Sequence, residues 1–228
     1  MGASDPGPEP VIGGSSGTGG VIVNKEGEYT VARHANGTIQ WAFRTTSLTY
    51  NWNSSGYTAP LNQWTHIAVV FDRGVIRTYA DGNLVHTYTN AGTIGDAVTS
   101  YNDLWIGGRP QVSQYFAGSL DEVRVWNVAR TEAQIRADLA RQLAGTDAGL
   151  VGYWRLEEGA GTTAADSSEL ASHGTLGRGV ATNSPVWAAS GAPVARNAIR
   201  VTYTDLGGMD PATVTDPAAY TVLASGGD

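Results

Sequence analysis

The chain has 228 residues, a formal net charge of -7 and a pI near 5.0, and 15% of its residues are charged. The acidic balance, with no stretch that gathers Lys and Arg, excludes a basic surface for nucleic acid. Cysteine is absent, which excludes disulfides and thiolate metal sites, and no segment approaches the roughly 18 apolar residues of a membrane span. We therefore expect neither a nucleic-acid partner nor membrane insertion.

The chain begins with a segment rich in Pro, Gly and Ser, residues 1–19, which is typical of a linker or a disordered start. This segment lacks the charged n-region and the apolar h-region of an export signal. If the protein is secreted, we expect its export signal to lie upstream in a longer parent chain.

From Gly20 to Arg109 the sequence is a series of short alternating runs separated by Gly or Asn, a pattern that predicts antiparallel strands. Residues 34–37 and Asp81-Gly82 are typical hairpin turns. The expected strands cover residues 21–23, 29–33, 38–43, 64–71, 75–80, 84–88 and 104–108. So many short strands indicate a sandwich or jelly roll rather than alternating βα units.

The run from Phe116 to Asn127 alternates apolar and polar residues like a half-buried strand. Asp121 and Glu122 suggest acid chemistry, but neighbours on a strand point to opposite faces, so the two carboxylates cannot converge on one reacting atom. The alternation places Leu120, Glu122, Arg124 and Trp126 on one face, and Asp121, Val123 and Val125 on the other. We therefore interpret the run as the closing strand of the scaffold.

The sequence predicts one helix after this run. Thr131 and Gln134 form a capping box, and Ile135, Leu139 and Leu143 recur at four-residue spacing. Gly145 stands where a C-terminal cap belongs, so we expect the helix to extend to it, along the edge of the sandwich.

The remainder of the chain predicts one strand near residues 149–154, a composition break at 188–193, and two strands within 197–203 and 219–223. Two strands are too few for a core of their own, so we interpret the tail as the start of a second β domain. The predicted fold is an all-β, antiparallel two-sheet jelly-roll sandwich with one short helix and a partial β tail. Its predicted divisions are residues 1–19, 20–187, 188–196 and 197–228.

Five segments in this order carry a family resemblance: residues 62–71, 79–83, 104–108, 116–127 and 149–166. Together they resemble the laminin-G-like, concanavalin A-like jelly-roll family of bacterial surface and secreted proteins, over roughly residues 20–187. The tail, 197–228, resembles the start of a bacterial immunoglobulin-like repeat. The opening strands usual in the family do not appear before Gly20, so we expect a partly unpaired sheet edge.

The resemblance implies a non-catalytic recognition module in a large extracellular or cell-surface bacterial protein, such as an adhesin or a polysaccharide-degrading enzyme. Its expected partners are a glycan or an extracellular protein ligand, and the neighbouring domains of the parent. The alternative is a purely structural spacer. A glycoside hydrolase is disfavoured, because hydrolases that resemble this family carry carboxylates two residues apart on one strand, and no such Glu-x-Asp-x-Glu pattern occurs here.

A sugar-binding surface needs aromatic rings beside amide and hydroxyl groups, since the C–H face of a sugar packs on a ring. The segment from Tyr50 to Tyr57 supplies this mixture, with Tyr50 and Trp52 on one face of a predicted strand. The expected ligand-binding residues are Tyr50, Trp52, Asn53, Tyr57, Tyr101 and Tyr115. The alternative role of Trp52 is ordinary core between the sheets, which is the expectation for Trp41, Trp64, Trp105, Trp126, Trp154 and Trp187.

The resemblance also implies a structural Ca²⁺ ion with Asp121 as a ligand. Calcium takes six to eight oxygen ligands, so one carboxylate is insufficient. The alternative is that Asp121 caps a turn or pairs with Arg124. Asp147 and Asp166 are further acidic candidates, and Asp166 is equally suited to cap a turn.

Overall fold

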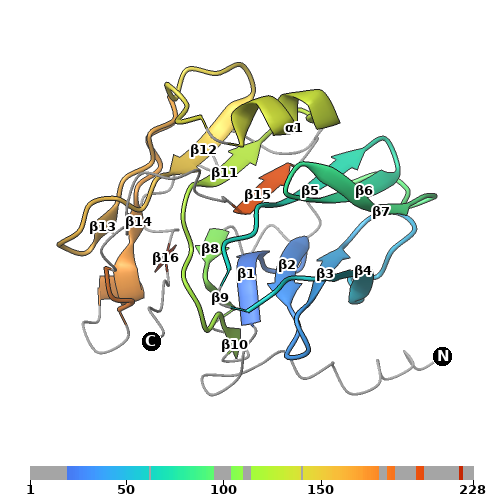
Figure 1. Cartoon of the computed structure of the whole chain (residues 1–228), viewed down its shortest axis with the longest axis horizontal. Helices are drawn as coiled ribbons and strands as arrows, with labels where there is room; N and C mark the ends of the chain where they lie inside the picture. Colours follow the sequence, from blue (N-terminus) through green and yellow to red (C-terminus); the bar gives the residue numbers. More distant parts are fainter. Residues whose placement is uncertain are drawn as a thin grey trace.

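The computed structural model describes residues 20–61, 63–94, 104–109, 114–139, 141–179, 184–187, 199–202 and 221–222. Two sheets stack face to face, and the one α-helix of this part of the chain lies on the outer side of the second sheet (Figure 1). The all-β, two-sheet sandwich predicted from the alternating runs is thereby confirmed.

The first sheet has the strand order β16-β8-β1-β2-β3-β4. Its members are β1 (Gly20–Lys25), β2 (Tyr29–Arg33), β3 (Thr38–Phe43), β4 (Asn53–Thr58), β8 (Leu104–Ile106) and β16 (Thr221–Val222). Strands β1 to β4 pair in sequence as an antiparallel meander.

The second sheet has the strand order β12-β11-β15-β5-β6-β7. Its members are β5 (Ile67–Asp72), β6 (Val75–Ala80), β7 (Asn83–Tyr88), β11 (Val123–Trp126), β12 (Leu150–Trp154) and β15 (Ile199–Thr202). The turns between β5, β6 and β7 carry consecutive positive φ angles, 45° and 81° at Arg73-Gly74 and 47° and 75° at Asp81-Gly82. These are type I′ turns, whose twist matches that of antiparallel strands, so the hairpins that the sequence predicts are confirmed.

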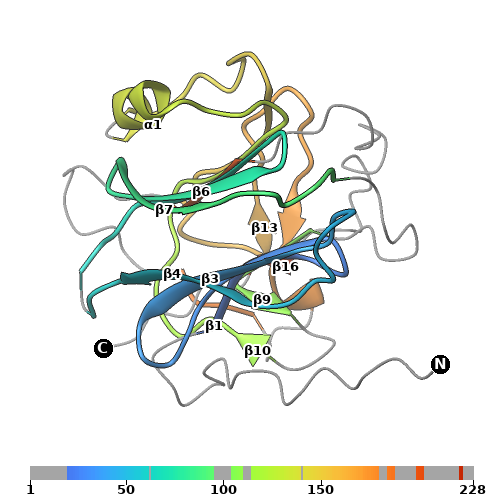
Figure 2. The ribbon, with the colours of Figure 1, turned by 90° about the vertical axis from the view of Figure 1, so that its right-hand side faces the viewer.

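Two small sheets complete the β structure. They pair β9 (Gly108–Arg109) with β10 (Gln114–Tyr115), and β13 (Thr163–Ala164) with β14 (Gly174–Thr175), which the 3-10 turn η2 (Leu176–Gly179) follows. Figure 2 shows β9 and β10 beneath the first sheet, on the side away from the second. This small hairpin therefore borders the outer face of the first sheet.

The main core lies between the two sheets and is built from alternate residues of their strands. Val31 and Trp41 from the first sheet and Val69 and Ile76 from the second are at most 1% exposed. Trp41 lies edge-on to Phe43, with ring centroids 5.6 Å apart. The residues between these positions point to the outer faces, and on the first sheet that face carries the candidate site.

The helix α1 (Glu132–Asp138) begins as predicted but ends earlier. Thr131 caps it, and the full capping box with Gln134 is present. Beyond Leu139 the chain leaves the helix, and Leu143 packs with Trp126 and Tyr153 instead of extending the helical stripe. The prediction of a helix reaching Gly145 is therefore wrong.

The tail strands lie within the two sheets. β15 pairs with both β11 and β5, and β16 pairs with β8 at an edge of the first sheet. In the part of the tail that the structure describes, the strands thus extend the sandwich, which differs from the separate second domain expected for 197–228. The assignment of this tail to an immunoglobulin-like repeat stays a prediction. No helix among the described residues has the length and apolarity needed to cross a membrane.

Candidate functional site

The outer face of the first sheet carries two rows of small and polar side chains. One row runs across the sheet through Asn24, Thr30 and Ala42, and the next through Val21, Ala32, Gln40 and Ser54. Most of these residues are buried although they lie outside the main core. Other side chains must therefore cover this face.

Tyr50 covers the first row. It adopts a φ of 62° before β4 begins, and its backbone N–H donates to the carbonyl of Phe43. From there its hydroxyl reaches Thr30 Oγ1 at 2.5 Å and donates to Asn24 Oδ1 at 3.2 Å. Burial raises the pKa of Tyr50 to about 12, and the nearby carboxylate of Glu26 acts in the same direction. Tyr50 is thus a neutral, hydrogen-bonded phenol at physiological pH.

An ion pair closes the site beside Tyr50. Arg109, from β9, donates through Nε and Nη2 to the two carboxylate oxygens of Glu26, at 2.7 and 2.8 Å. The guanidinium carbon lies 5.7 Å from the centre of the Tyr50 ring. A bidentate pair of this kind leaves no net charge, so the local surface is polar and neutral.

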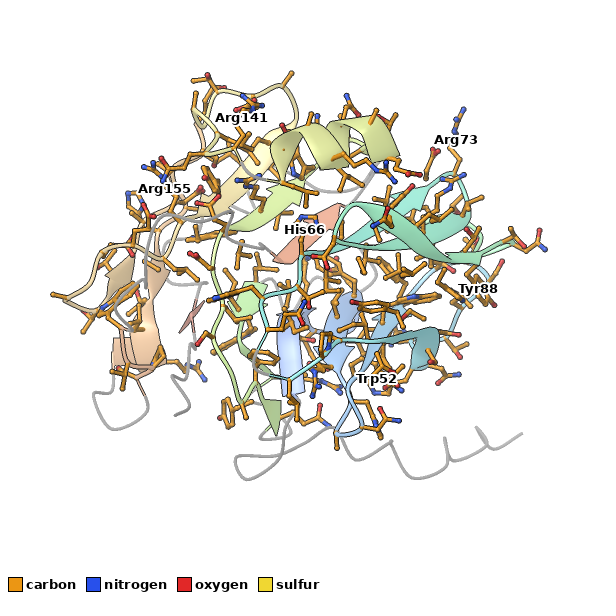
Figure 3. The ribbon with its side chains drawn as sticks, in the orientation of Figure 1. Trp52, His66, Arg73, Tyr88, Arg141 and Arg155 are labelled. Carbon is orange, nitrogen blue, oxygen red and sulfur yellow. The ribbon has the colours of Figure 1, made fainter. Side chains whose placement is uncertain are left out.

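Trp52 covers the second row. Its backbone precedes β4, yet its side chain packs against Ala32 on β2 and Val21 on β1. Because neighbouring strands lie about 4.8 Å apart, the indole must extend across β3 along the outer face of the sheet. The ring is only half-buried, and Figure 3 places Trp52 on the side of the first sheet away from the second. Part of the indole therefore rests on the sheet, and the part that stays exposed can meet a ligand.

Gln40 lies in the same row, next to Ala32 and paired with the exposed Ser54. Its buried amide oxygen, Oε1, has no hydrogen-bond partner among the residues that the structure describes. An acceptor without a donor is costly to bury, so this atom gains a hydrogen bond when a shift of the side chains around it admits a ligand hydroxyl or a water molecule. We call Gln40, Tyr50, Trp52 and Ser54 the outer-face site.

The structure brings together only some of the predicted ligand-binding residues. Tyr50 and Trp52 share the outer face as expected, although they precede the strand that was expected to carry them. Asn53 begins that strand and donates through Nδ2 to the carbonyl of Asn51 at 2.8 Å. Tyr57 instead packs against the main core, where burial and then the Asp81 carboxylate raise its pKa.

The other two predicted ligand residues add little to the site. Tyr115 is half-buried in β10 and pairs with Gly108, while Tyr101 lies outside the described residues. Sequence reasoning missed Gln40, Arg109 and Glu26. Gln40 could have been recognised as a site residue only from the pairing of β3 with β4, because that pairing places its amide beside Ser54.

The remaining tryptophans follow the core prediction with one clear exception. Trp41, Trp105, Trp126 and Trp154 are at most 3% exposed, and Trp187 is half-buried. Trp64 is 45% exposed, so its assignment to the core is wrong. It lies in the segment just before β5, where the expected strand has not yet begun.

The predicted closing strand is shorter than its alternation suggests. Only Val123–Trp126 forms β11, because Glu122 adopts a φ of 54° and interrupts the strand. Val123 and Val125 face the main core as expected, but so does Leu120, which was expected on the opposite face. Asp121 is 8% exposed at this interruption, just before β11.

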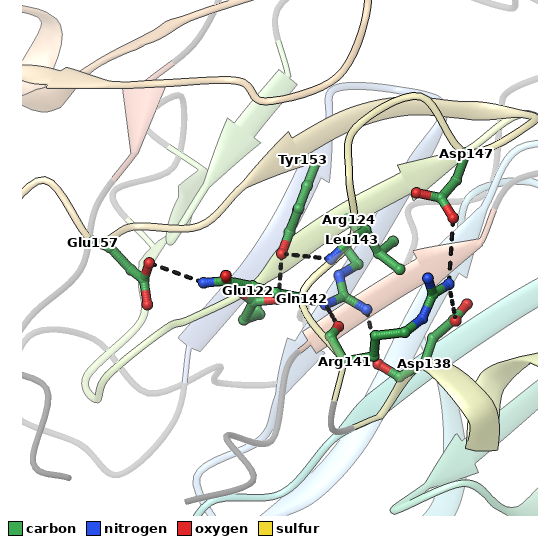
Figure 4. A network of polar contacts seen from close by, with 9 residues as sticks. All are labelled: Glu122, Arg124, Asp138, Arg141, Gln142, Leu143, Asp147, Tyr153 and Glu157. Atoms are coloured by element: carbon green, nitrogen blue, oxygen red, sulfur yellow. Dashed lines mark hydrogen bonds and ion pairs between the residues drawn. The ribbon is translucent and has the colours of Figure 1, made fainter. Parts of the chain in front are cut away.

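Glu122 belongs to a buried structural network (Figure 4). Arg124 donates to Glu122 and to the carbonyls of Asp138 and Arg141, and Tyr153 donates its hydroxyl to Glu122 at 2.7 Å. The guanidinium carbon lies 4.9 Å from the centre of the Tyr153 ring. The network therefore holds Glu122 in the scaffold and gives the carbonyls at the end of α1 a donor.

The other acidic candidates also have structural partners. Asp166 accepts four hydrogen bonds, from the backbone N–H groups of Tyr153, Ser168 and Ser172 and from the Ser168 hydroxyl, at 2.8 to 2.9 Å. Its role as a turn cap is thereby confirmed. Asp147 lies 3.3 Å from Arg141.

A calcium ion would need several oxygen ligands around Asp121. Within the described part of the chain, no three side chains of His, Asp or Glu gather closely enough to hold a metal ion, at Asp121 or elsewhere. The described carboxylates thus do not form a calcium donor set, and no step of the proposed function passes through a metal. The calcium site at Asp121 stays a prediction of the family resemblance.

Comparison with known proteins gives one family and two similar structures. A family model described as the concanavalin A-like lectin/glucanases superfamily matches residues 11–136. No curated protein sequence matches the chain. A "putative carbohydrate binding protein" from Bacteroides ovatus shares the fold, with a TM-score of 0.55 and 22% identity over 66% of this chain. The chain covers 45% of the length of that protein.

The second structure is an S-layer domain-containing protein from Clostridium thermocellum. It is 18% identical, covers 48% of this chain and 54% of its own, and has a TM-score of 0.27.

Proposed function

Because the chain belongs to the concanavalin A-like lectin/glucanase superfamily, we propose that it is a carbohydrate-binding module that uses the outer-face site. The observation that carries this proposal is the half-buried Trp52 side chain, which packs on the outer face of the sheet in the row that also holds Gln40. A sugar ring can pack its C–H face on the indole while its hydroxyls meet the exposed Ser54, and Gln40 once a shift of side chains uncovers its Oε1. The structural neighbour described as a "putative carbohydrate binding protein" supports the same class of ligand.

The charges around the site favour a neutral glycan. Arg109 and Glu26 neutralise each other beside Tyr50, and the phenol is uncharged at physiological pH, as it would be even at its ordinary pKa. A carboxylated or sulfated sugar would find no free cation among these residues. We therefore expect neutral polysaccharides to bind more tightly than acidic ones.

The proposed role is non-catalytic. Glu122 is engaged by Arg124 and Tyr153, and Asp166 is saturated by four hydrogen bonds, so neither carboxylate is placed to act on a sugar. Such a module would serve a larger extracellular or cell-surface protein, an adhesin or a polysaccharide-degrading enzyme, whose other domains supply its further functions.

A glycan array with neutral and acidic polysaccharides tests the proposal. We expect saturable binding to a neutral glycan that falls about 5- to 100-fold in Trp52→Ala, the range expected for losing one buried aromatic contact. Trp64→Ala is the matched control, because Trp64 is a tryptophan with 45% exposure that lies outside the outer-face site. We expect this control to bind like the wild type.

Two results would contradict the proposal. Absence of saturable binding to every glycan would favour the alternative role of a structural spacer. Equal loss of binding in Trp52→Ala and Trp64→Ala would place the ligand elsewhere. Thermal melting of both variants checks folding, since removal of Trp52 also uncovers Val21 and Ala32.

A further inference from the structure

Strand β15 joins two parts of the second sheet. It lies between β5 and β11, with Val201 paired to Val69 on one side and to Val125 on the other. In the strand order of this sheet, β15 is the link between the β12-β11 pair and the β5-β6-β7 hairpins. Removal of β15 would leave a slot between β11 and β5.

The pairing of this strand is unlike the pairing of the other strands in its sheet. It runs parallel to both β5 and β11, whereas the pairings among strands β1 to β14 are antiparallel. Antiparallel neighbours can be joined by a tight turn, but a parallel strand needs a longer connection. The chain reaches β15 from Trp187 through residues 188–198, which span at most about 36–40 Å when extended. No hairpin turn therefore ties this strand to either of its neighbours.

The slot between β5 and β11 requires a strand to fill it. β5 is buried from Ile67 to Phe71 and β11 is buried throughout, so an empty slot would leave their backbone N–H and C=O groups unpaired in the interior. Ile67 and Val69 belong to the main core, and Ile199 and Val201 stand at the positions paired with them. Arg200 stands at the position paired with Arg124.

We propose that the slot between β5 and β11 is a strand-acceptor site, and that Ile199–Thr202 of a second copy of this chain can fill it. The same strand fills the slot from its own chain in the structure described above. Exchange of an identical element between copies preserves every backbone pairing and changes only the connection, which makes it a low-cost route to association. The second copy is the favoured partner because its strand carries the same apolar residues in the same register.

Cysteine pairs test this proposal directly, because the natural chain contains no cysteine. Directly paired residues of neighbouring strands lie close enough for a disulfide to form. One copy carries Val69→Cys and the other carries Val201→Cys, and the two are unfolded, mixed and refolded in a redox buffer. We expect a disulfide-linked heterodimer that increases with protein concentration and is several-fold above a control pair of Thr87→Cys with Val201→Cys.

A chain that carries both Val69→Cys and Val201→Cys shows whether β15 stays in the slot of its own copy. If this double variant forms its disulfide within one copy at every concentration, and the mixed copies do not exceed the control, exchange is refuted. If the double variant forms no disulfide at all, β15 does not occupy the slot, and the proposal also fails.

A second readout needs no cysteine and covers the case in which Val69→Cys does not fold. Wild-type chains with and without ¹⁵N are refolded together and examined by native mass spectrometry. We expect mixed-label dimers in the wild type and their loss in Val201→Pro, because proline lacks the N–H that a central strand must donate. Monomers alone in the concentrated wild type, or dimers that persist in Val201→Pro, would refute the proposal.

Discussion

Replacing Arg124 with methionine should destabilise the fold strongly. Arg124 is 1% exposed and gives hydrogen bonds to Glu122 and to the carbonyls of Asp138 and Arg141. Methionine fills much of the volume but leaves the Glu122 carboxylate buried without its cation. Removing one partner of a buried ion pair costs about 3–5 kcal/mol in the free energy of unfolding. For a chain of this size that corresponds to a melting midpoint lower by about 6–20 °C.

Urea unfolding followed by circular dichroism measures this loss. The double variant Glu122→Gln/Arg124→Met should be more stable than Arg124→Met alone, because it removes the unpaired buried charge. Arg73→Met is the matched control: the Arg73 side chain is 77% exposed in its pair with Asp72, so we expect a change within about 0.5 kcal/mol. A loss below about 1 kcal/mol in Arg124→Met, or a double variant less stable than that single variant, would refute the reasoning about this network.

Two further predictions concern Tyr50 and Asp121. Tyrosine ionises near pH 10 in the unfolded chain, whereas burial raises the pKa of Tyr50 to about 12 in the folded protein. The contribution of Tyr50 to stability is therefore complete below about pH 10 and is lost between about pH 10 and 12, so Tyr50→Phe should flatten the decline in stability over this interval, and unchanged alkaline unfolding curves would contradict this. If Asp121 binds calcium, millimolar calcium should raise the melting midpoint of the wild type but not of Asp121→Asn, and an unchanged wild-type midpoint would eliminate the site.

The antiparallel hairpins could be predicted because their information is local. The alternation of Val75–Ala80 and the Asp81-Gly82 dipeptide specify a strand and a type I′ turn without reference to the rest of the chain. The same holds for the start of α1, where Thr131 and Gln134 cap each other. These elements appear in the structure where the sequence predicts them.

The features that the sequence did not reveal depend on residues far apart in the chain. The alternation around Glu122 continues through a residue with a positive φ, which no local pattern of non-glycine residues announces. The helix α1 ends early where Arg124, on another element, donates to the carbonyl of Asp138. The four-residue spacing of Ile135, Leu139 and Leu143 cannot show that a guanidinium on another element will bind this carbonyl.

The candidate site could be predicted only in part, because some of its residues are close in the chain and others are far apart. Tyr50 and Trp52 are two residues apart, so their shared face follows from local geometry even though the strand begins later than expected. The ion pair between Arg109 and Glu26 joins segments 83 residues apart, and its place beside Tyr50 depends on the β9–β10 hairpin. The neutral charge of the site could therefore be derived only from the structure.

The partial burial of Trp52 bears on the two roles considered for this chain. Its buried part packs on Val21 and Ala32, and this contact stabilises the sheet whether the domain binds a ligand or only spaces its neighbours. A spacer would gain nothing from the exposed part of the indole or from the unpartnered acceptor of Gln40. Both features cost free energy in water, since one exposes apolar surface and the other buries a polar atom without a donor. Their occurrence on one sheet face supports the proposal that the chain binds a sugar over the proposal that it is a spacer.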